Sequence, residues 1–298
     1  MINAELIQNN KNGEVNKNIK VLMYHRVLWE KPEEEVKWHY VTATEFENHM
    51  KWLDRFGYTT ITFTDYLLYQ LGDLSLPKKP IIITFDDGYH DTFENAIPIM
   101  LKYNMRGVIF VMGNRSMRRA NWDDPEIEND CLLMNDDQIR MAESFGFEIG
   151  AHSMNHLDLI SINDEDLGHE IMWSKFQIEQ ILGKPIYSFA YPYGRVDERV
   201  QMAALEAGFR FACGVYTGPA WFGENNFDIR RIAIGDEIGS LTFLLRVLTP
   251  FEYVEWSYAK IKDTTLTRDR KKPSLDNSRK NGKLVKDGLQ QKPEVLVN

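Results

Sequence analysis

Short apolar runs alternate with amphipathic segments along most of the chain. The runs lie at about 19–24, 58–62, 80–85, 107–112, 147–151, 186–190, 209–215 and 229–234, and helical periodicity is clearest at 44–56, 91–103, 136–145, 164–182 and 196–207. Runs of this length, rich in β-branched residues, are typical of strands buried on both faces of a parallel sheet. Alternating strands and helices predict right-handed crossovers. Seven or eight such units predict one α/β domain, a closed or nearly closed barrel.

The helical segments predict one N-cap and the exposure of three histidines. The segment 44–56 presents Phe46, Met50 and Leu53 on one face, and Thr44 is its predicted N-cap. His39, His49 and His169 occur in polar or helical contexts, so we predict that all three lie on the surface.

Composition separates the two ends of the chain from this domain. Residues 1–18 are rich in Asn and Lys, whereas in 262–298 Lys and Arg outnumber Asp and Glu by ten to five. Both ends are predicted to be disordered, which leaves 19–261 as the domain; an alternative is that the basic tail anchors the protein to an anionic surface. The net charge of -9 argues against general nucleic-acid binding.

Neither a membrane span nor a secretion signal is evident in the sequence. There is no run of 18 apolar residues and no apolar stretch near the N-terminus, so the expected location is the cytoplasm. Cys131 and Cys213 are too few and too far apart for a CxxC motif or a disulfide framework.

The first candidate for chemistry is a pair of carboxylates at the end of a predicted buried strand. The run at 80–85 ends in Thr84-Phe85-Asp86-Asp87-Gly88. The carboxyl ends of parallel strands are where barrels and open α/β sheets carry their sites. Adjacent carboxylates repel each other unless a cation lies nearby. The alternative is an ordinary turn, with Asp86 capping the next helix.

Two further motifs follow other predicted strands. The first, His152-Ser153-Met154-Asn155-His156, places two imidazoles four residues apart, within reach of one ion. The second, Tyr191-Pro192-Tyr193-Gly194, places aromatic rings beside a rigid proline. A surface histidine pair and a Pro-Gly loop with core aromatics are the alternatives. If the strand ends share one rim, one carboxylate and two histidines suit Zn²⁺ or another divalent first-row metal.

Taken in order, the three motifs resemble those of the polysaccharide deacetylase family, the NodB-homology domain of carbohydrate esterase family 4. The resemblance runs from about Val21-Leu22-Met23-Tyr24-His25 to about Ile234, and it is closest to the branch that includes poly-N-acetylglucosamine deacetylases. It implies a distorted (β/α)7-8 barrel that binds one divalent metal, Zn²⁺ or alternatively Ni²⁺ or Co²⁺.

The resemblance also implies roles for individual residues. Asp87, His152 and His156 would bind the metal, and Asp86 would act as general base. The backbone N–H of Tyr193 would face the oxyanion, because Pro192 has no N–H. Tyr191, Pro192 and His25 would contact the substrate, an amino-sugar glycan.

The sequence departs from the family at two positions. Ala190 replaces the arginine that orients the base in many members. In Ile232-Ala233-Ile234-Gly235-Asp236, Gly235 stands where a histidine usually supplies the proton for the leaving amine. Asp236 and His25 are the alternatives for this general acid, and His25 could equally be a packed core or rim histidine.

Three functions fit these observations. The leading hypothesis is a hydrolase that removes N-acetyl groups from an amino sugar of a polysaccharide, oligosaccharide or glycan precursor. The second keeps the chemistry but changes the amide, for example deformylation of a lipid-linked sugar. The third, suggested by Ala190 and Gly235, is a carbohydrate-binding protein with little or no turnover.

Overall fold

The computed structural model describes residues 19–32, 39–120, 122, 131–215, 220, 222, 225–251, 253–254 and 257. Met1–Tyr258 form one compact unit, and the second unit, Ala259–Asn298, lies outside the described residues. The predictions of disorder at 1–18 and 262–298, and of a surface-anchoring tail, also fall outside them. Within the described ranges, no helix is both long enough and apolar enough to cross a membrane.

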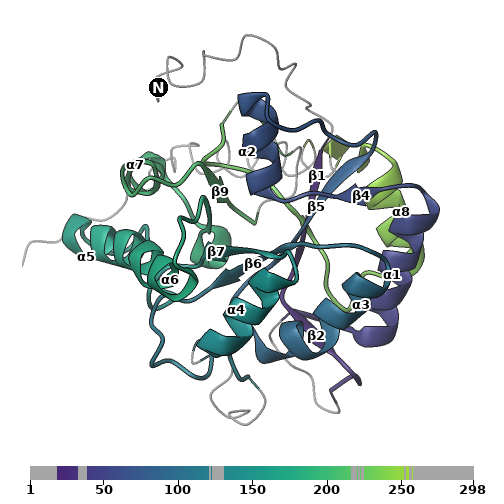
Figure 1. The fold of residues 1–298 in the computed structure, drawn as a ribbon, viewed down its shortest axis with the longest axis horizontal. Helices are drawn as coiled ribbons and strands as arrows, with labels where there is room; N and C mark the ends of the chain where they lie inside the picture. The colour runs from purple at the N-terminus through teal and green to yellow at the C-terminus, as the bar shows by residue number, and fades with distance from the viewer. Residues whose placement is uncertain are drawn as a thin grey trace, which may run out of the picture. The chain divides into compact units, whose positions relative to one another are not determined.

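A parallel sheet forms the centre of the domain, in the order β10-β1-β5-β6-β7-β8-β9, with β4 paired to β5. The sheet curls into a half-barrel with helices around it, which confirms the predicted α/β barrel-like fold (Figure 1). All eight predicted strands are present: β1 Lys20–Tyr24, β4 Thr59–Thr60, β5 Pro80–Phe85, β6 Val108–Val111, β7 Glu148–Ala151, β8 Ser188–Ala190, β9 Phe211–Cys213 and β10 Ile232–Ala233.

The segment that leads into β10 contacts both edges of the curled sheet. Ile229 forms a parallel bridge with Cys213 of β9, and its N–H donates to the carbonyl of Ala212 at 3.0 Å. Three residues later, Ile232 pairs with Leu22 of β1. The few residues between these two pairings are therefore held across the gap between the sheet edges.

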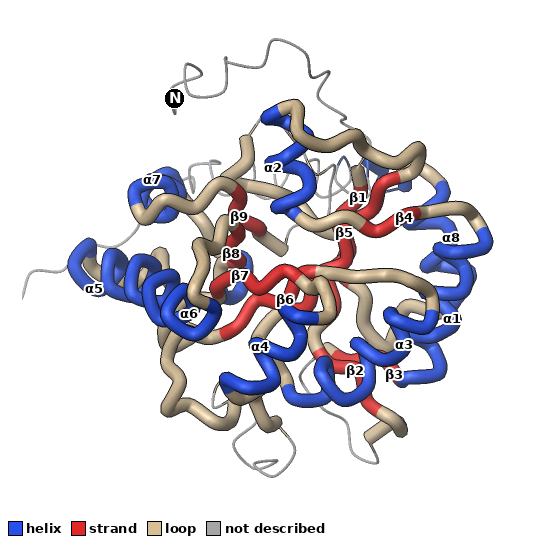
Figure 2. Tube along the Cα trace, viewed as in Figure 1, coloured by secondary structure: helices blue, strands red, loops and turns tan. Residues whose placement is uncertain are grey.

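The helices surround this sheet (Figure 2). They are α1 Ala43–Arg55, α2 Phe63–Leu71, α3 Ile97–Lys102, α4 Asp136–Ser144, α5 Asp164–Gly168, α6 Ser174–Leu182, α7 Glu198–Glu206 and α8 Ser240–Leu248. A π-helical turn, η2 Thr92–Ala96, leads into α3, and a second, η4 His169–Trp173, joins α5 to α6. The five predicted helices are thus confirmed. The helices α2 and α8 and a small sheet of β2 Arg26–Leu28 and β3 Tyr40–Thr42 were not predicted.

Side chains alternate along the strands between two apolar clusters. Leu22 and Ile83 belong to the cluster that packs against the surrounding helices. Val21, Ile82 and Phe110 belong to a second cluster, which includes residues of α2. Because strand side chains point alternately to the two faces, β1, β5, β6, β8 and β9 contribute to both clusters and are buried on both sides.

Two predictions about α1 were wrong. The N-cap is Thr42 rather than Thr44: its hydroxyl accepts the N–H of Glu45, and the Glu45 side chain accepts the N–H of Thr42, a complete capping box. His49 is buried, not exposed, because it follows Phe46 by three residues and lies on the apolar face of the helix.

Candidate active site

The turn after β5 separates the two adjacent carboxylates. Asp87 and Gly88 both have φ near +70°, so the chain reverses sharply at this strand end. A Cβ on Gly88 would lie 2.8 Å from Cγ1 of Val111, so glycine also allows close packing here. Asp86 and Asp87 are both buried, but they contact different partners.

Asp87 meets the two histidines of the second motif. One ligand atom from each of Asp87, His152 and His156 lies within 4.8 Å of the others, and all three side chains are buried. Oδ1 of Asp87 is 3.1 Å from Nε2 of His152 and 3.3 Å from Nε2 of His156. The three predicted metal ligands, which follow two strands far apart in the sequence, therefore converge on one point.

The geometry of this cluster fits a metal ion. Oδ1 of Asp87 is buried and, despite these short distances, has no partner in hydrogen-bond geometry. Nδ1 of His152 lies 2.8 Å from the carbonyl of Ala190, which can only accept, so Nδ1 carries the proton. In the neutral imidazole, Nε2 then presents a lone pair toward Asp87, an arrangement typical of metal-binding histidines. A divalent cation would satisfy all three atoms.

Burial and contacts act in opposite directions on the pKa values at this cluster. Burial alone would raise the pKa of Asp87, but contacts with His152 and His156 outweigh it and hold that pKa well below its ordinary value. Burial would lower the pKa of His152, yet Asp87 and Asp86 raise it overall. The cluster is therefore rich in negative charge, which favours a cation.

Asp86 pairs with an arginine that the sequence analysis did not identify. Arg231 donates from Nη1 to Oδ1 of Asp86 at 2.6 Å and from Nη2 to Oδ2 at 2.7 Å. It also donates to Thr84 Oγ1 and to the carbonyl of Gly214, and it lies over the ring of Phe110. This bidentate pair is fully buried, and Arg231 lies in the segment between Ile229 and Ile232 that joins the two sheet edges.

Arg231 favours the ionised form of Asp86. Burial would raise the pKa of Asp86, but the charge and hydrogen bonds of Arg231 lower it below its ordinary value. An arginine therefore contacts Asp86, but it comes from the segment before β10 and not from position 190. A signal was present in the sequence: Arg231 interrupts the apolar run 229–234, and a charge in a buried strand requires a partner.

The two alternatives for the general acid differ in their surroundings. Asp236 is 43% exposed, and its carboxylate accepts the hydroxyl of Tyr40 at 3.2 Å. His25 is partly buried, and its pKa is lowered by burial, although Asp87 and Asp86 act to raise it. His25 therefore lies close enough to both carboxylates to interact with them electrostatically. Gly235, at the position where the family usually has a histidine, packs closely against Glu237: a Cβ there would lie 2.5 Å from the Glu237 carboxylate.

The third motif places its two tyrosines differently. The turn η5 Pro192–Gly194 follows β8, and Tyr193 within it has φ +57°. The Tyr193 ring is half exposed and meets His156 edge-on, with ring centroids 4.6 Å apart. The side chain of Tyr191 is buried and donates its hydroxyl to the carbonyl of Phe227 at 3.0 Å. Tyr193, rather than the side chain of Tyr191, is thus presented at the site.

An aromatic ring from a distant loop also covers the metal-ligand cluster. Trp122 stacks on the imidazole of His156, with centroids 4.1 Å apart and ring planes 14° apart. Phe222, by contrast, is buried against Tyr66 and Phe63.

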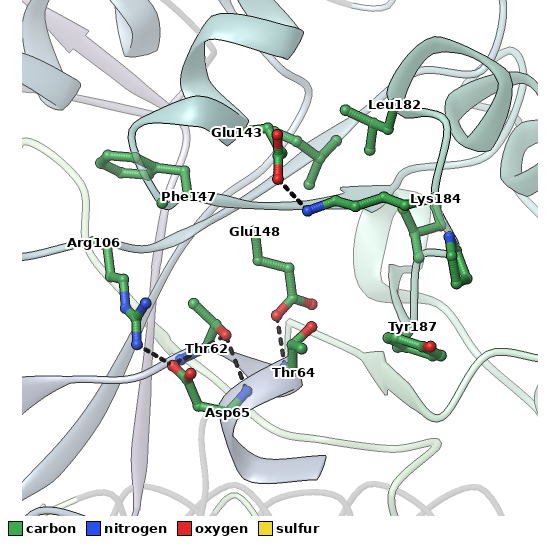
Figure 3. A pocket seen from close by; sticks show the side chains of 14 residues that line it. Thr62, Thr64, Asp65, Arg106, Glu143, Phe147, Glu148, Leu182, Lys184 and Tyr187 are labelled. Carbon is green, nitrogen blue, oxygen red and sulfur yellow. Dashed lines mark hydrogen bonds and ion pairs between the residues drawn. The ribbon is translucent and has the colours of Figure 1, made fainter. Parts of the chain in front are cut away.

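A cavity of about 370 Å³ lies at the opposite ends of the strands. Its lining includes Glu148 at the start of β7 and Tyr187 just before β8. Its charged groups already have partners, as Figure 3 shows: Arg106 pairs with Asp65, Lys184 pairs with Glu143, and Glu148 accepts the backbone N–H of Thr64. None of the metal-ligand residues lines it, so this cavity is separate from the candidate active site.

Several known proteins of similar sequence or fold are named as deacetylases. Residues 73–212 match the family model for polysaccharide deacetylase. YxkH of Bacillus subtilis (strain 168), which its name places in the same family, is 27% identical over 203 residues, 68% of each chain. The poly-beta-1,6-N-acetyl-D-glucosamine N-deacetylase of Staphylococcus aureus (strain MRSA252) is 23% identical over 211 residues, 68% of this chain and 70% of that protein.

A solved structure shows the same fold. The Streptococcus pyogenes deacetylase PplD, in complex with acetate, superposes with a TM-score of 0.66 at 22% identity. The superposition covers 78% of this chain and 98% of that one.

Proposed function

Because the chain carries a polysaccharide deacetylase domain of the NodB type, we propose that it is a metal-dependent hydrolase of N-acetylated amino sugars. Its substrate would be a polysaccharide, oligosaccharide or glycan precursor, and its products acetate and a free amine. The observation that carries the proposal is the convergence of Asp87, His152 and His156 beside a carboxylate that Arg231 keeps ionised.

Asp87, His152 and His156 would hold the metal. Such an ion, Zn²⁺ or alternatively Ni²⁺ or Co²⁺, would act as a Lewis acid toward water and the amide carbonyl. Two imidazole nitrogens and one carboxylate leave positions open for water and substrate. The support for this assignment is the burial of the three ligand atoms and the tautomer imposed on His152 by Ala190.

Asp86 would take the proton from water. A general base must be unprotonated at working pH, and Arg231 lowers the pKa of Asp86. The same two hydrogen bonds fix the plane of the carboxylate, so one oxygen can be aimed at the attacking water. The backbone N–H of Tyr193 would stabilise the oxyanion as the carbonyl becomes tetrahedral.

His25 would contact the sugar. Since its lowered pKa leaves it unprotonated beforehand, it would accept the proton that Asp86 took from water and pass it to the nitrogen as the amide C–N bond breaks. It is partly buried and interacts with both carboxylates, whereas Asp236 is exposed and bonded to Tyr40. The half-exposed ring of Tyr193 offers a face on which a sugar can stack.

One experiment tests the proposal. The purified protein is analysed for bound metal by mass spectrometry and assayed for acetate release from N-acetylglucosamine oligomers. Asp86→Asn and His152→Ala remove the base and one ligand. Asp137→Asn and His169→Ala make the same chemical changes at exposed positions and serve as controls.

One metal per chain, with acetate release that Asp86→Asn abolishes and Asp137→Asn preserves, would establish the deacetylase. Release of formate or another acid from a panel of amides, without acetate, would point to a different amide substrate. Glycan binding without turnover or metal would favour a binding protein and refute the proposal.

A further inference from the structure

The loop that links the two histidine ligands adopts an unusual backbone conformation. Ser153 has φ +62° and His156 has φ +58°, and neither is glycine. Each such residue costs about 1–3 kcal/mol, so the conformation persists only where its surroundings hold it. Part of the support comes from the segment after β6: Gly113 and Asn114 donate their N–H groups to the carbonyls of Ser153 and Met154 at 2.8 and 3.1 Å.

Further support comes from the Ser153 hydroxyl, which accepts the N–H of His156 at 3.0 Å, and from the carboxylate of Glu170. Its Oε2 accepts the backbone N–H groups of Met154 at 3.0 Å and Asn155 at 2.8 Å, and its Oε1 accepts Nδ2 of Asn155 at 2.6 Å. Glu170 is 2% exposed and lies in the π-helical turn η4, between α5 and α6. A π turn inserts one residue into a helix and so alters the direction of its side chains.

A carboxylate is needed here because the hydrogen-bond chain that ends on Glu170 has a fixed direction. The backbone N–H of Ser116, which can only donate, bonds Oδ1 of Asn114 at 3.2 Å. Nδ2 of Asn114 therefore donates to Oδ1 of Asn155 at 2.8 Å, and Nδ2 of Asn155 must donate onward to Glu170. With the two backbone N–H groups, Glu170 faces donors at both oxygens. A glutamine would place its own NH₂ against the amide of Asn155.

We propose that Glu170 is a positioning residue for the metal centre. By accepting three hydrogen bonds from the loop, its carboxylate holds the left-handed turn at Ser153 and His156, and so aims both imidazoles at Asp87. Metal affinity then depends on a residue that contacts no ligand atom. The inference rests on the proposed metal site, but not on the identity of the substrate.

Zn²⁺ titration against a chromophoric chelator, with the metal-free protein, tests this role. Glu170→Gln keeps the shape but loses one acceptor, and we expect its Zn²⁺ affinity to fall about 10–100-fold, as is typical when a ligand-orienting partner is changed. Glu165→Gln, the same change at an exposed position of α5, should bind as wild type. In an Asn155→Ala background, Glu170→Gln should change Zn²⁺ affinity little further, because the NH₂ group of the new glutamine no longer faces the side-chain amide of Asn155.

Thermal unfolding of the metal-free variants separates positioning from general stabilisation. Equal Zn²⁺ affinity in wild type and Glu170→Gln, with a lower melting temperature for the variant, would mean a merely structural role and overturn the inference. If Glu170→Gln does not fold, Asn155→Ala, which removes one of the three bonds, replaces it, and wild-type affinity there has the same meaning.

The wild-type titration separates this inference from the proposed function. A wild type that binds Zn²⁺ but releases no acetate refutes the deacetylase and leaves the role of Glu170 to be decided by its variants. A wild type that binds no Zn²⁺ overturns both.

Discussion

Replacing Arg231 with methionine should disable the base and destabilise the fold together. Arg231→Met keeps an unbranched side chain of similar length but removes the guanidinium that donates two hydrogen bonds to Asp86 at 2.6 and 2.7 Å. It also removes the donor to the carbonyl of Gly214, beside the sheet edge at β9. The carboxylate of Asp86 then remains buried without a partner.

The expected size follows from the burial of this pair, in which the two side chains are 0% and 2% exposed. Removing one partner of a buried ion pair costs about 3–5 kcal/mol of unfolding free energy. Burial, no longer opposed by Arg231, raises the pKa of Asp86. Since general-base catalysis contributes about 10²–10⁴-fold, kcat should fall by at least about 10². The stability loss should be largest at neutral pH and shrink as pH falls, because the unpaired carboxylate is unfavourable only while charged.

Urea unfolding and acetate release, measured on the same preparations, check this prediction. Arg230→Met alters the neighbouring arginine, whose 3.9 Å ion pair with Asp228 is partly exposed, and should cost only about 0–1 kcal/mol. Adding Asp86→Asn to Arg231→Met should recover stability but not activity. If Arg231→Met unfolds like Arg230→Met and keeps wild-type kcat, the reasoning about Asp86 is refuted.

Three further predictions follow from single residues. Gly194→Ala should lower the unfolding free energy in urea by about 3–5 kcal/mol, because φ is +64° and the new Cβ would lie 1.6 Å from Val215. Gly57→Ala, at φ +71° with no atom within 4 Å, should lower it by only about 1 kcal/mol. Equal losses would contradict the steric argument. Burial lowers the pKa of His49 from 6.5 to about 4. Between pH 7 and pH 4, the unfolding free energy of wild type should therefore fall by about 3 kcal/mol more than that of His49→Gln, and an equal fall in both proteins would disprove this. His25→Ala should lower kcat about 10²-fold or more with one metal per chain retained, and an unchanged kcat would exclude His25 as proton donor.

Local sequence patterns were sufficient to predict most of the fold. Each of the eight strands is a short apolar run, and the predicted helices have apolar faces with a period of 3.6 residues. The small sheet of β2 and β3 was missed because its strands have three residues each, too short to show a period. The start of α2 has a signal in the sequence, the capping box of Thr62 and Asp65, so this helix was predictable. The prediction that His49 is exposed was wrong because it followed from the polarity of histidine, whereas the position of His49 on α1 places it on the buried face.

The sequence by itself determined the groups that lie at strand ends. Asp86 and Asp87, His152 and His156 each follow a buried run directly, and parallel strands bring such ends to one rim. Candidates for the metal ligands and for the general base, and the resemblance to the family, could therefore be identified from short motifs.

Only the tertiary structure decided which distant residues support them. Arg231 reaches Asp86 because its segment contacts both edges of the sheet, a pairing that depends on how far the whole sheet curls. Glu170 reaches the histidine loop because a π turn changes its direction within an otherwise regular helical stretch. Both effects depend on packing between segments far apart in sequence, and local periodicity carries no information about such distances.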